Sequence, residues 1–152
     1  MATTILVKPT NGTTLAMSST LPATYDSGGY TAITPTAVGE VLSIGEIAKT
    51  YSVISHQSVG RAYPQKIKDV YDIGNVSITM ARITSDTGQD IMNLALASAN
   101  SYTFRITLPS TAVEHFTGKV IKVGLGVISP TGIETVVMDI AVDPESLFEA
   151  NI

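Results

Sequence analysis

Apolar and polar side chains alternate along residues 74–108, and the pattern changes from a strand period to a helix period and back again. Val76, Ile78 and Met80 alternate with small or polar residues, which is typical of a half-buried strand. Residues 102–108 show the same period of two with larger apolar side chains on one face. Between the two runs lies a stretch composed mostly of helix formers. These residues predict a strand–helix–strand unit around which the rest of the chain is organised.

The helix between these strands is predicted to span residues 87–99. Thr87 can serve as its N-cap, and Asp90 lies three residues later in the capping-box position, where Glu or Gln is the usual partner. Asp86 and Asp90 also suit the positive end of the helix dipole. Asn100 stands where a residue in the left-handed conformation is expected to end the helix.

Two apolar strips run along the predicted helix, and the sequence leaves two interpretations of the second strip open. In one, the helix lies deep in the core of its own subunit. In the other, the first strip faces the core while Met92 and Leu96 face a neighbouring subunit. The first strip consists of Ile91, Leu94, Ala95 and Ser98, and the second of Met92, Leu96 and Ala99.

Further alternating runs predict strands before and after this unit. The last run places Asp139 as the single acid on the face opposite to the core, among side chains that are mostly small. Ser129-Pro-Thr-Gly132 predicts a hairpin connection just before this run. The predicted strands comprise residues 38–47, 51–56, 115–128 and 133–142.

The segment between His56 and Gly74 is the most highly charged part of the chain and is predicted to be a long loop over residues 56–73. A connection of this length in a small domain commonly has a function or bears an interaction. Three basic groups within eight residues suggest a phosphate-binding patch. The neighbouring acids instead favour a solvated loop, or a contact between subunits rather than with DNA. The charged residues are Arg61, Lys66, Lys68, Asp69 and Asp72.

Both ends of the chain have an irregular pattern. Residues 1–36 are rich in turn formers and are predicted to be an N-terminal arm. This arm is either a partly ordered extension or a segment that becomes ordered on a neighbouring subunit. Pro144 ends the last strand, so residues 144–152 are predicted to be a short acidic tail. Residues 37–143 remain as a single domain.

The composition adds that the chain carries unusually few charges. Only 14% of its 152 residues are charged, against about 25% in an average soluble protein. We expect a surface rich in Ser and Thr, much of it buried against other subunits. The net charge of −4 argues against a nucleic-acid-binding surface. No window approaches the roughly 18–20 apolar residues that span a bilayer, so no membrane anchor is predicted.

No constellation of catalytic residues is visible. His56 and His115 lie far apart in the sequence and belong to no metal-binding pattern. Without cysteine, neither a thiol nucleophile nor a thiolate metal site is available. We therefore predict a protein that is not an enzyme and that uses no cofactor or metal. The first residues lack the pattern of a signal peptide, so synthesis and use in a cytoplasm are expected.

The order of these elements resembles the tail tube (major tail) proteins of long, flexible-tailed bacteriophages, the group that includes the lambda tail tube protein. The resemblance covers roughly residues 37–143, and no single motif in it is diagnostic. It rests on the charged loop Arg61–Asp72, the strand Gly74–Met80, the helix entry Thr87–Leu94, the aromatic strand Tyr102–Ile106, the strand Phe116–Val120 and the last hairpin.

The resemblance implies a mainly β, α+β fold, in which a β-sandwich or barrel carries a flanking α-helix. It implies homo-hexameric rings that stack into a tail tube, with the long loop contacting the adjacent ring. The lumen would hold the tape measure protein and pass DNA without specific binding, and Asp139 is the candidate for an acidic lumen wall. Tail terminator and tail tip or baseplate proteins would be further partners. The protein would be made in the host bacterial cytoplasm and would reside in the virion tail.

Two other classes of function stay open from the sequence. One is a different ring-forming virion or secretion-system component, such as a tail terminator, a capsid decoration protein or a type VI tube-like ring. The other is a soluble β-sandwich domain that binds carbohydrate or acts as an enzyme, for which the absence of Trp is unfavourable.

Overall fold

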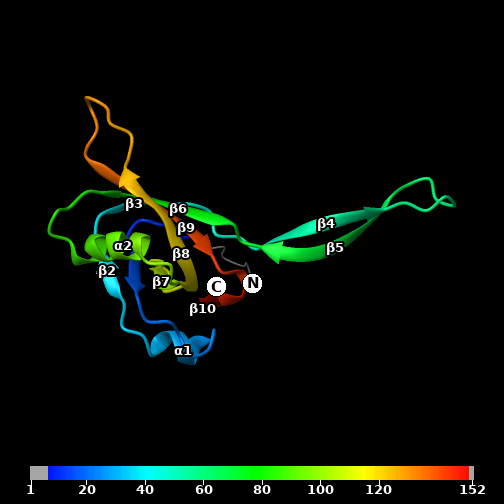
Figure 1. The fold of residues 1–152 in the computed structure, drawn as a ribbon, viewed down its shortest axis with the longest axis horizontal. Coiled ribbons are helices and arrows are strands. Elements are labelled where there is room, and N and C mark those ends of the chain that lie inside the picture. The colour runs from blue at the N-terminus through cyan, green and yellow to red at the C-terminus, as the bar shows by residue number, and fades with distance from the viewer. Residues whose placement is uncertain (1–6, 151–152) are drawn as a thin grey trace, which may run out of the picture.

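The computed structural model describes residues 7–150, which form a curved β-sheet, a helix against it and a hairpin that projects away (Figure 1). Seven strands follow the order β2-β1-β7-β8-β9-β6-β3, β10 pairs with β8 beside this path, and β4 pairs with β5. The strands are β1 (Thr14–Ser18), β2 (Thr36–Val38), β3 (Val41–Ile44), β4 (Thr50–His56), β5 (Gln65–Asp72), β6 (Asn75–Ala81), β7 (Tyr102–Thr107), β8 (Val113–Leu125), β9 (Thr135–Val142) and β10 (Phe148–Ala150). The helices are α1 (Ser27–Thr31), α2 (Thr87–Ala97) and the 3-10 helix η1 (Pro144–Ser146).

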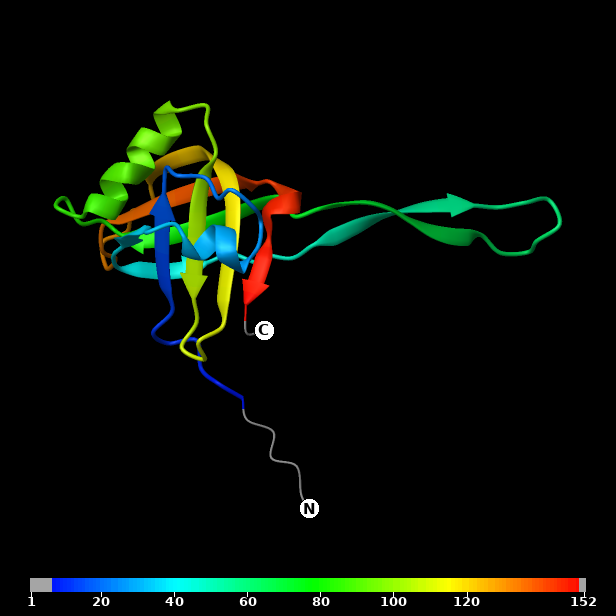
Figure 2. The ribbon, with the colours of Figure 1, turned by 90° about the horizontal axis from the view of Figure 1, so that it is seen from below.

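The main sheet rolls into a barrel because its two edge strands are consecutive in the chain. β2 and β3 lie at opposite ends of the strand order, yet only Gly39 and Glu40 connect them. The two edges of the sheet must therefore meet, and Figure 2 shows the strands curling around a common centre. Glu40 adopts the left-handed conformation at this tight connection, with φ of 56°. The prediction of a mainly β fold with a flanking α-helix is confirmed.

The barrel is filled by the inward-facing side chains of its strands. Phe104 of β7 and Phe116 of β8 are fully buried and stack with their ring centroids 5.2 Å apart. A β-bulge in β8 lies between Val120 and Lys122, and the extra residue, Ile121, is half exposed. The fully buried apolar residues of the other strands are Leu15, Met17, Val76, Ile78, Met80, Met138 and Ile140.

The first turn of α2 is fixed by Asp86, and the prediction that Thr87 is the N-cap is wrong. The Asp86 carboxylate accepts a hydrogen bond from the Gln89 backbone N–H at 3.2 Å and another from the Gly39 N–H at 3.1 Å. It therefore caps the helix and also ties it to the β2–β3 connection. The helix ends at Ala97, with Ser98 in an extended conformation, two residues before the predicted end at residue 99.

The face of α2 that lies on the barrel is marked by Gly88, Met92 and Ala95. A Cβ atom on Gly88 would lie 2.4 Å from the Ala37 carbonyl oxygen, so the helix touches β2 through its backbone. Met92 and Ala95 follow on the same side and are completely buried. Met92 therefore belongs to the core of its own subunit, and its assignment to an inter-subunit face is wrong. Leu94, predicted for the core, is 65% exposed, because the contact at Gly88 rotates it away.

The N-terminal segment is part of the barrel, so the prediction of an arm over residues 1–36 is wrong for the described residues. β1 pairs with both β2 and β7. Leu15 and Met17 of β1 are buried and alternate with less buried residues. This strand pattern is short, and turn formers on both sides make it hard to detect in the sequence. Tyr30 of α1 stacks on His115 at 4.7 Å, and its hydroxyl donates a hydrogen bond to the Ser146 carbonyl.

The C-terminal segment is also ordered on the barrel, in contrast to the predicted tail over residues 144–152. Residues 151 and 152 lie outside the described residues. β10 pairs with the first part of β8, and Phe148 lies opposite His115. The Ser146 side chain is fully buried and accepts a hydrogen bond from the Thr117 backbone N–H at 2.9 Å. These contacts explain why the chain after Pro144 is ordered on the barrel.

The predicted long loop over residues 56–73 is instead the second half of a β-hairpin. β4 and β5 pair from Thr50 with Asp72 to His56 with Gln65, and only residues 57–64 connect them. Neither strand joins the main sheet, so the hairpin extends well beyond the barrel (Figures 1 and 2). The sequence of β5 shows no alternation of apolar and polar residues, because none of its residues is buried in a core.

Candidate functional site

The described residues offer surfaces rather than a chemical centre. Across residues 7–150, no group of three or more His, Cys, Asp or Glu side chains is placed to hold a metal ion. No helix in this part of the chain is long and apolar enough to cross a membrane. The features that stand out are the projecting hairpin, the opposite end of the barrel and the outer face of the sheet.

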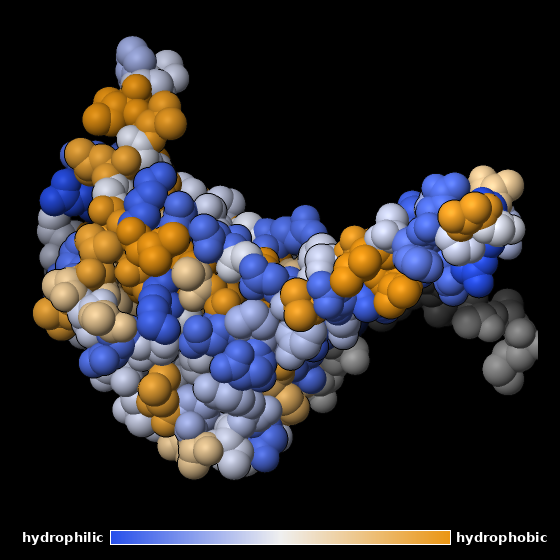
Figure 3. Space-filling view, turned by 45° about the vertical axis from the view of Figure 1, so that its right-hand side comes forward, coloured by the Kyte–Doolittle hydropathy of each residue, from blue (hydrophilic) through white to orange (hydrophobic). Residues whose placement is uncertain are grey.

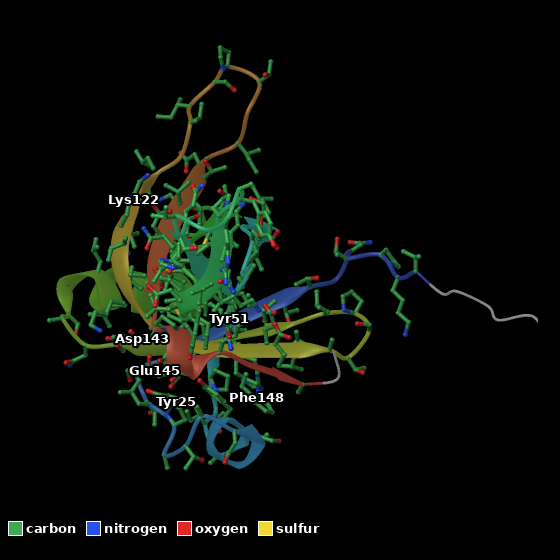
Figure 4. All side chains as sticks on the ribbon, turned by 90° about the vertical axis from the view of Figure 1, so that its right-hand side faces the viewer. Tyr25, Tyr51, Lys122, Asp143, Glu145 and Phe148 are labelled. Carbon is green, nitrogen blue, oxygen red and sulfur yellow. The ribbon has the colours of Figure 1, made fainter. Side chains whose placement is uncertain are left out.

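One face of the hairpin carries a ladder of aromatic and basic side chains. The Lys49 Nζ lies 4.7 Å from the centre of the Tyr71 ring, and the Lys68 Nζ lies 4.6 Å from the centre of the Tyr51 ring. The two tyrosine rings are 5.4 Å apart. Successive residues of a strand point to opposite faces, so Lys66, two residues before Lys68, lies on the same face as Lys68. Figure 4 views this hairpin from its tip and labels Tyr51, which pairs with Tyr71 near the base of the hairpin.

The rest of the hairpin exposes apolar side chains that a monomer would leave in water. Ile54 and Ile67 pair across the strands on the face opposite to the ladder, and each is about half exposed. Val59 and Tyr63 are the large apolar residues of the tip, and both are mostly exposed. An isolated two-stranded hairpin is only marginally stable in water. Exposed apolar residues on such an element therefore mark an interaction surface (Figure 3).

The predicted contact residues of this segment fall into separate places. Lys66 and Lys68 come together on the ladder face, whereas Arg61 lies in the connection at the tip. Asp69 lies at the irregularity of β5 opposite Ser52, and Asp72 pairs with Thr50 at the base of the hairpin. The sequence indicated the charges, but only the strand register separates them into a ladder, a tip and a base.

The charge of the chain is divided between the hairpin and the barrel. Residues 49–72 contain four basic and two acidic side chains and carry a formal charge of +2. The whole chain carries −4, so the remaining residues carry −6. A positive projection on a negative body can attract a second copy of the same chain.

The end of the barrel opposite to the hairpin concentrates acidic residues, and we call it the acidic end. Glu40, Asp86, Asp90 and Glu134 oppose only Arg82 there, which gives a formal charge of −3. Hydrogen bonds hold these segments together: the Ala81 N–H donates to the Glu40 carbonyl and the Arg82 N–H to the Glu134 carbonyl, each at 2.9 Å. The sequence alone did not reveal this cluster because its members come from three separate segments, namely the β2–β3 connection, the start of α2 and the β8–β9 connection (Figures 1 and 2).

Asp139, the predicted lumen residue, lies on the outer face of β9 and is already engaged. Its carboxylate accepts a hydrogen bond from the Ser77 hydroxyl at 2.7 Å and forms an ion pair with Lys122 at 3.9 Å. Further along β8, Lys119 and Asp143 form a second ion pair at 3.8 Å. Lys122 and Asp143 are labelled in Figure 4. The acid that the sequence singled out is therefore balanced by a lysine on the same face.

A groove of about 650 Å³ runs between β3 and the turn before β1, and Glu114 is among its lining residues. Glu114 lies directly opposite Glu149 across the β8–β10 pair. Burial, together with a hydrogen bond and the like charge of Glu149, raises the pKa of Glu114 to about 7. The two carboxyl groups can therefore share a proton where β10 meets the barrel.

This pair predicts that stability falls as pH rises. Because the folded pKa of Glu114 exceeds the ordinary value of 4.5, its contribution is fully present below that value and is lost as pH rises through about 7. We expect the apparent Tm of the wild-type protein to fall between pH 5 and 8, relative to that of Glu114→Gln. Burial lowers the pKa of His115, which costs stability as pH falls, but this effect is common to both proteins. A constant difference in Tm across this range would contradict the prediction.

Comparison with known proteins shows similarity of fold without detectable similarity of sequence. No protein-family model matches the chain, and no curated protein matches it. It is similar to a chain in the 6-fold symmetrised cryo-EM structure of the anti-feeding prophage (AFP) baseplate, with a TM-score of 0.63 and 7% identity, over 99% of this chain and 97% of that one. It is also similar to a chain in the virion of the native gene transfer agent (GTA) particle, with a TM-score of 0.61, 9% identity and coverages of 90% and 95%. A third similar chain comes from the C6-symmetric tail of the empty GTA particle, with a TM-score of 0.61, 10% identity and the same coverages.

Proposed function

We propose that this chain is a structural subunit of a phage-type tail, and that six copies form a ring whose stacking produces a tail tube. The observation that carries the proposal is the likeness of fold, over at least 90% of this chain, to chains of 6-fold symmetric particles. The projecting hairpin adds a physical reason, because it exposes apolar side chains and a positive charge that suit contact with another subunit. The protein would act by assembly and not by catalysis.

The proposal assigns a role to each exposed surface. The hairpin, with Arg61, Lys66, Lys68, Asp69 and Asp72, would contact the adjacent ring. The outer face of β6, β9 and β8, which includes Asp139, would line the lumen. Lysine and carboxylate charges balance there, which leaves a wall that neither repels nor retains a passing phosphate chain strongly. The tape measure protein would occupy this lumen before DNA, and tail terminator and tip or baseplate proteins would close its ends.

A second candidate function is a ring of the baseplate, at the end of a tail. It is favoured by the likeness to the AFP baseplate chain, which extends over 99% of this chain and 97% of that one. A baseplate ring differs from a tube subunit in copy number. It occurs in one or a few layers, whereas a tube subunit repeats along the whole tail.

Electron microscopy of the purified protein, and of virions that contain it, tests the proposal. Rings or tubes with six-fold symmetry are expected, and subunit-specific antibody labelling along the tail is expected for a tube subunit. Labelling confined to one end would support the baseplate ring instead. A discrete particle without rings, even with tail-initiation partners present, would refute both assignments.

A further inference from the structure

Taking the stacking of the proposed function as its premise, we propose that the hairpin tip of one copy binds a pocket at the acidic end of the next copy. The tip comprises residues 57–64, between β4 and β5. The pocket lies between the β8–β9 connection and the segment after β6. The occupant is thus a second copy of this chain, and each copy would offer one tip and one pocket.

The pocket combines an apolar wall with a carboxylate. It has a volume of about 230 Å³, and its lining includes Leu125, Ile128 and Ile133 together with Glu134 and Arg82. The three apolar side chains are 60%, 83% and 61% exposed, so a contact there would remove much apolar surface from water. The loop that carries the wall is held in place by a hydrogen bond from the Gly126 N–H to the Thr135 carbonyl at 2.9 Å.

The tip offers groups of matching chemistry. Val59 and Tyr63 are exposed side chains of the tip, so both are free to enter a pocket of another copy. Arg61 lies between them in the sequence, and its guanidinium donates a hydrogen bond to the Gln65 side chain. Neither Arg61 nor Glu134 takes part in the two ion pairs formed among residues 7–150. Arg61 and Glu134 are therefore available to pair between copies.

The position of the two surfaces favours this pairing over others. The hairpin and the β8–β9 connection project from different ends of the molecule (Figures 1 and 3). The hairpin carries +2 and the acidic end carries −3, so charge attraction orients successive copies head to tail. A contact between two different patches leaves one free patch of each kind in a dimer. Further copies can therefore be added along an axis. The same contact therefore provides both affinity and direction.

Charge reversal tests the pairing of Arg61 with Glu134. We expect Arg61→Glu and Glu134→Arg each to reduce the fraction of stacked protein at least about tenfold, because like charges then meet at the contact. The double variant should stack again by itself. A mixture of the two single variants should also stack, because each mixed contact joins opposite charges. Glu145→Arg is the matched control, since Glu145 is exposed in η1, and it should not restore stacking to Arg61→Glu.

Cross-linking gives a second measurement, which does not depend on the size of a charge effect. The chain contains no cysteine, so Val59→Cys with Ile133→Cys introduces the only two thiols. Oxidation of the assembled protein should yield a ladder of linked copies, whereas Val59→Cys with Leu94→Cys should not. If the wild-type protein stacks, but the Val59→Cys/Ile133→Cys variant gives no ladder and the double charge variant does not stack, this pairing alone is overturned. Binding of the hairpin to the groove at Glu114 of the next copy, or to another of its surfaces, would produce this result. Wild-type protein that forms neither rings nor stacks would overturn the proposed function itself.

Discussion

A variant in which residues 50–72 are replaced by a two-residue Asn-Gly turn is expected to fold normally and to form no stacked assemblies. Thr50 and Asp72 are paired at the base of the hairpin, so the ends that remain are close enough for a short turn. β4 and β5 pair only with each other, so their removal takes no hydrogen bond from the main sheet. The free energy of unfolding should therefore change by less than about 1 kcal/mol.

Two measurements decide this prediction. Circular dichroism with urea denaturation reports whether the barrel still folds, and electron microscopy or sedimentation reports stacking. A control that replaces residues 57–64 by Gly and Ser, at equal length, keeps both strands and removes only the tip. Loss of stacking in this control assigns the contact to the tip. Stacks formed by the full deletion would show that the hairpin is not the inter-ring contact.

Met92→Ala is expected to destabilise the barrel by about 2–5 kcal/mol. Met92 is completely buried between α2 and the strands, and truncation leaves a cavity that a helix held at Gly88 and Asp86 cannot readily close. Leu94→Ala, on the exposed side of the same helix, should cost less than about 0.5 kcal/mol. The shift of the urea midpoint at constant m-value measures both effects. Equal losses from the two variants would contradict the position of the helix on the barrel.

The sequence predicted most of the barrel because its strands have one buried face. Alternation in residues 74–108 identified β6, α2 and β7, and that of residues 133–142 identified β9. The sequence did not predict β1, because this strand has only two buried apolar side chains, Leu15 and Met17, between runs of turn formers. The sequence did not predict which face of α2 lies on the barrel, for a different reason. Both apolar strips satisfy a helical period, and the backbone contact at Gly88 selects the buried one only in three dimensions.

The candidate surfaces were less accessible from the sequence. The charges of residues 61–72 marked the correct segment, but a hairpin with no buried face gives no signal that separates it from a loop. The acidic end brings Glu40 and Glu134 to Asp86 and Asp90 in the first turn of α2, and no local pattern links these three segments. Asp139 was identified from its strand position, while its neighbours Ser77 and Lys122 follow from the strand register. These surfaces depend on the pairing register of the strands and on the closure of the barrel, and local periodicity in the sequence reports neither.

The attachment of the hairpin has a mechanical consequence. The hairpin joins the barrel only through residues 45–49 and through Ile73 and Gly74, where Gly74 has a φ of 76° and no neighbouring atom that would crowd a side chain. The barrel, in contrast, is closed on itself and filled with packed side chains. In a filament linked through such hairpins, bending would fall on the hairpins and their two connecting segments, while each packed barrel would keep its shape.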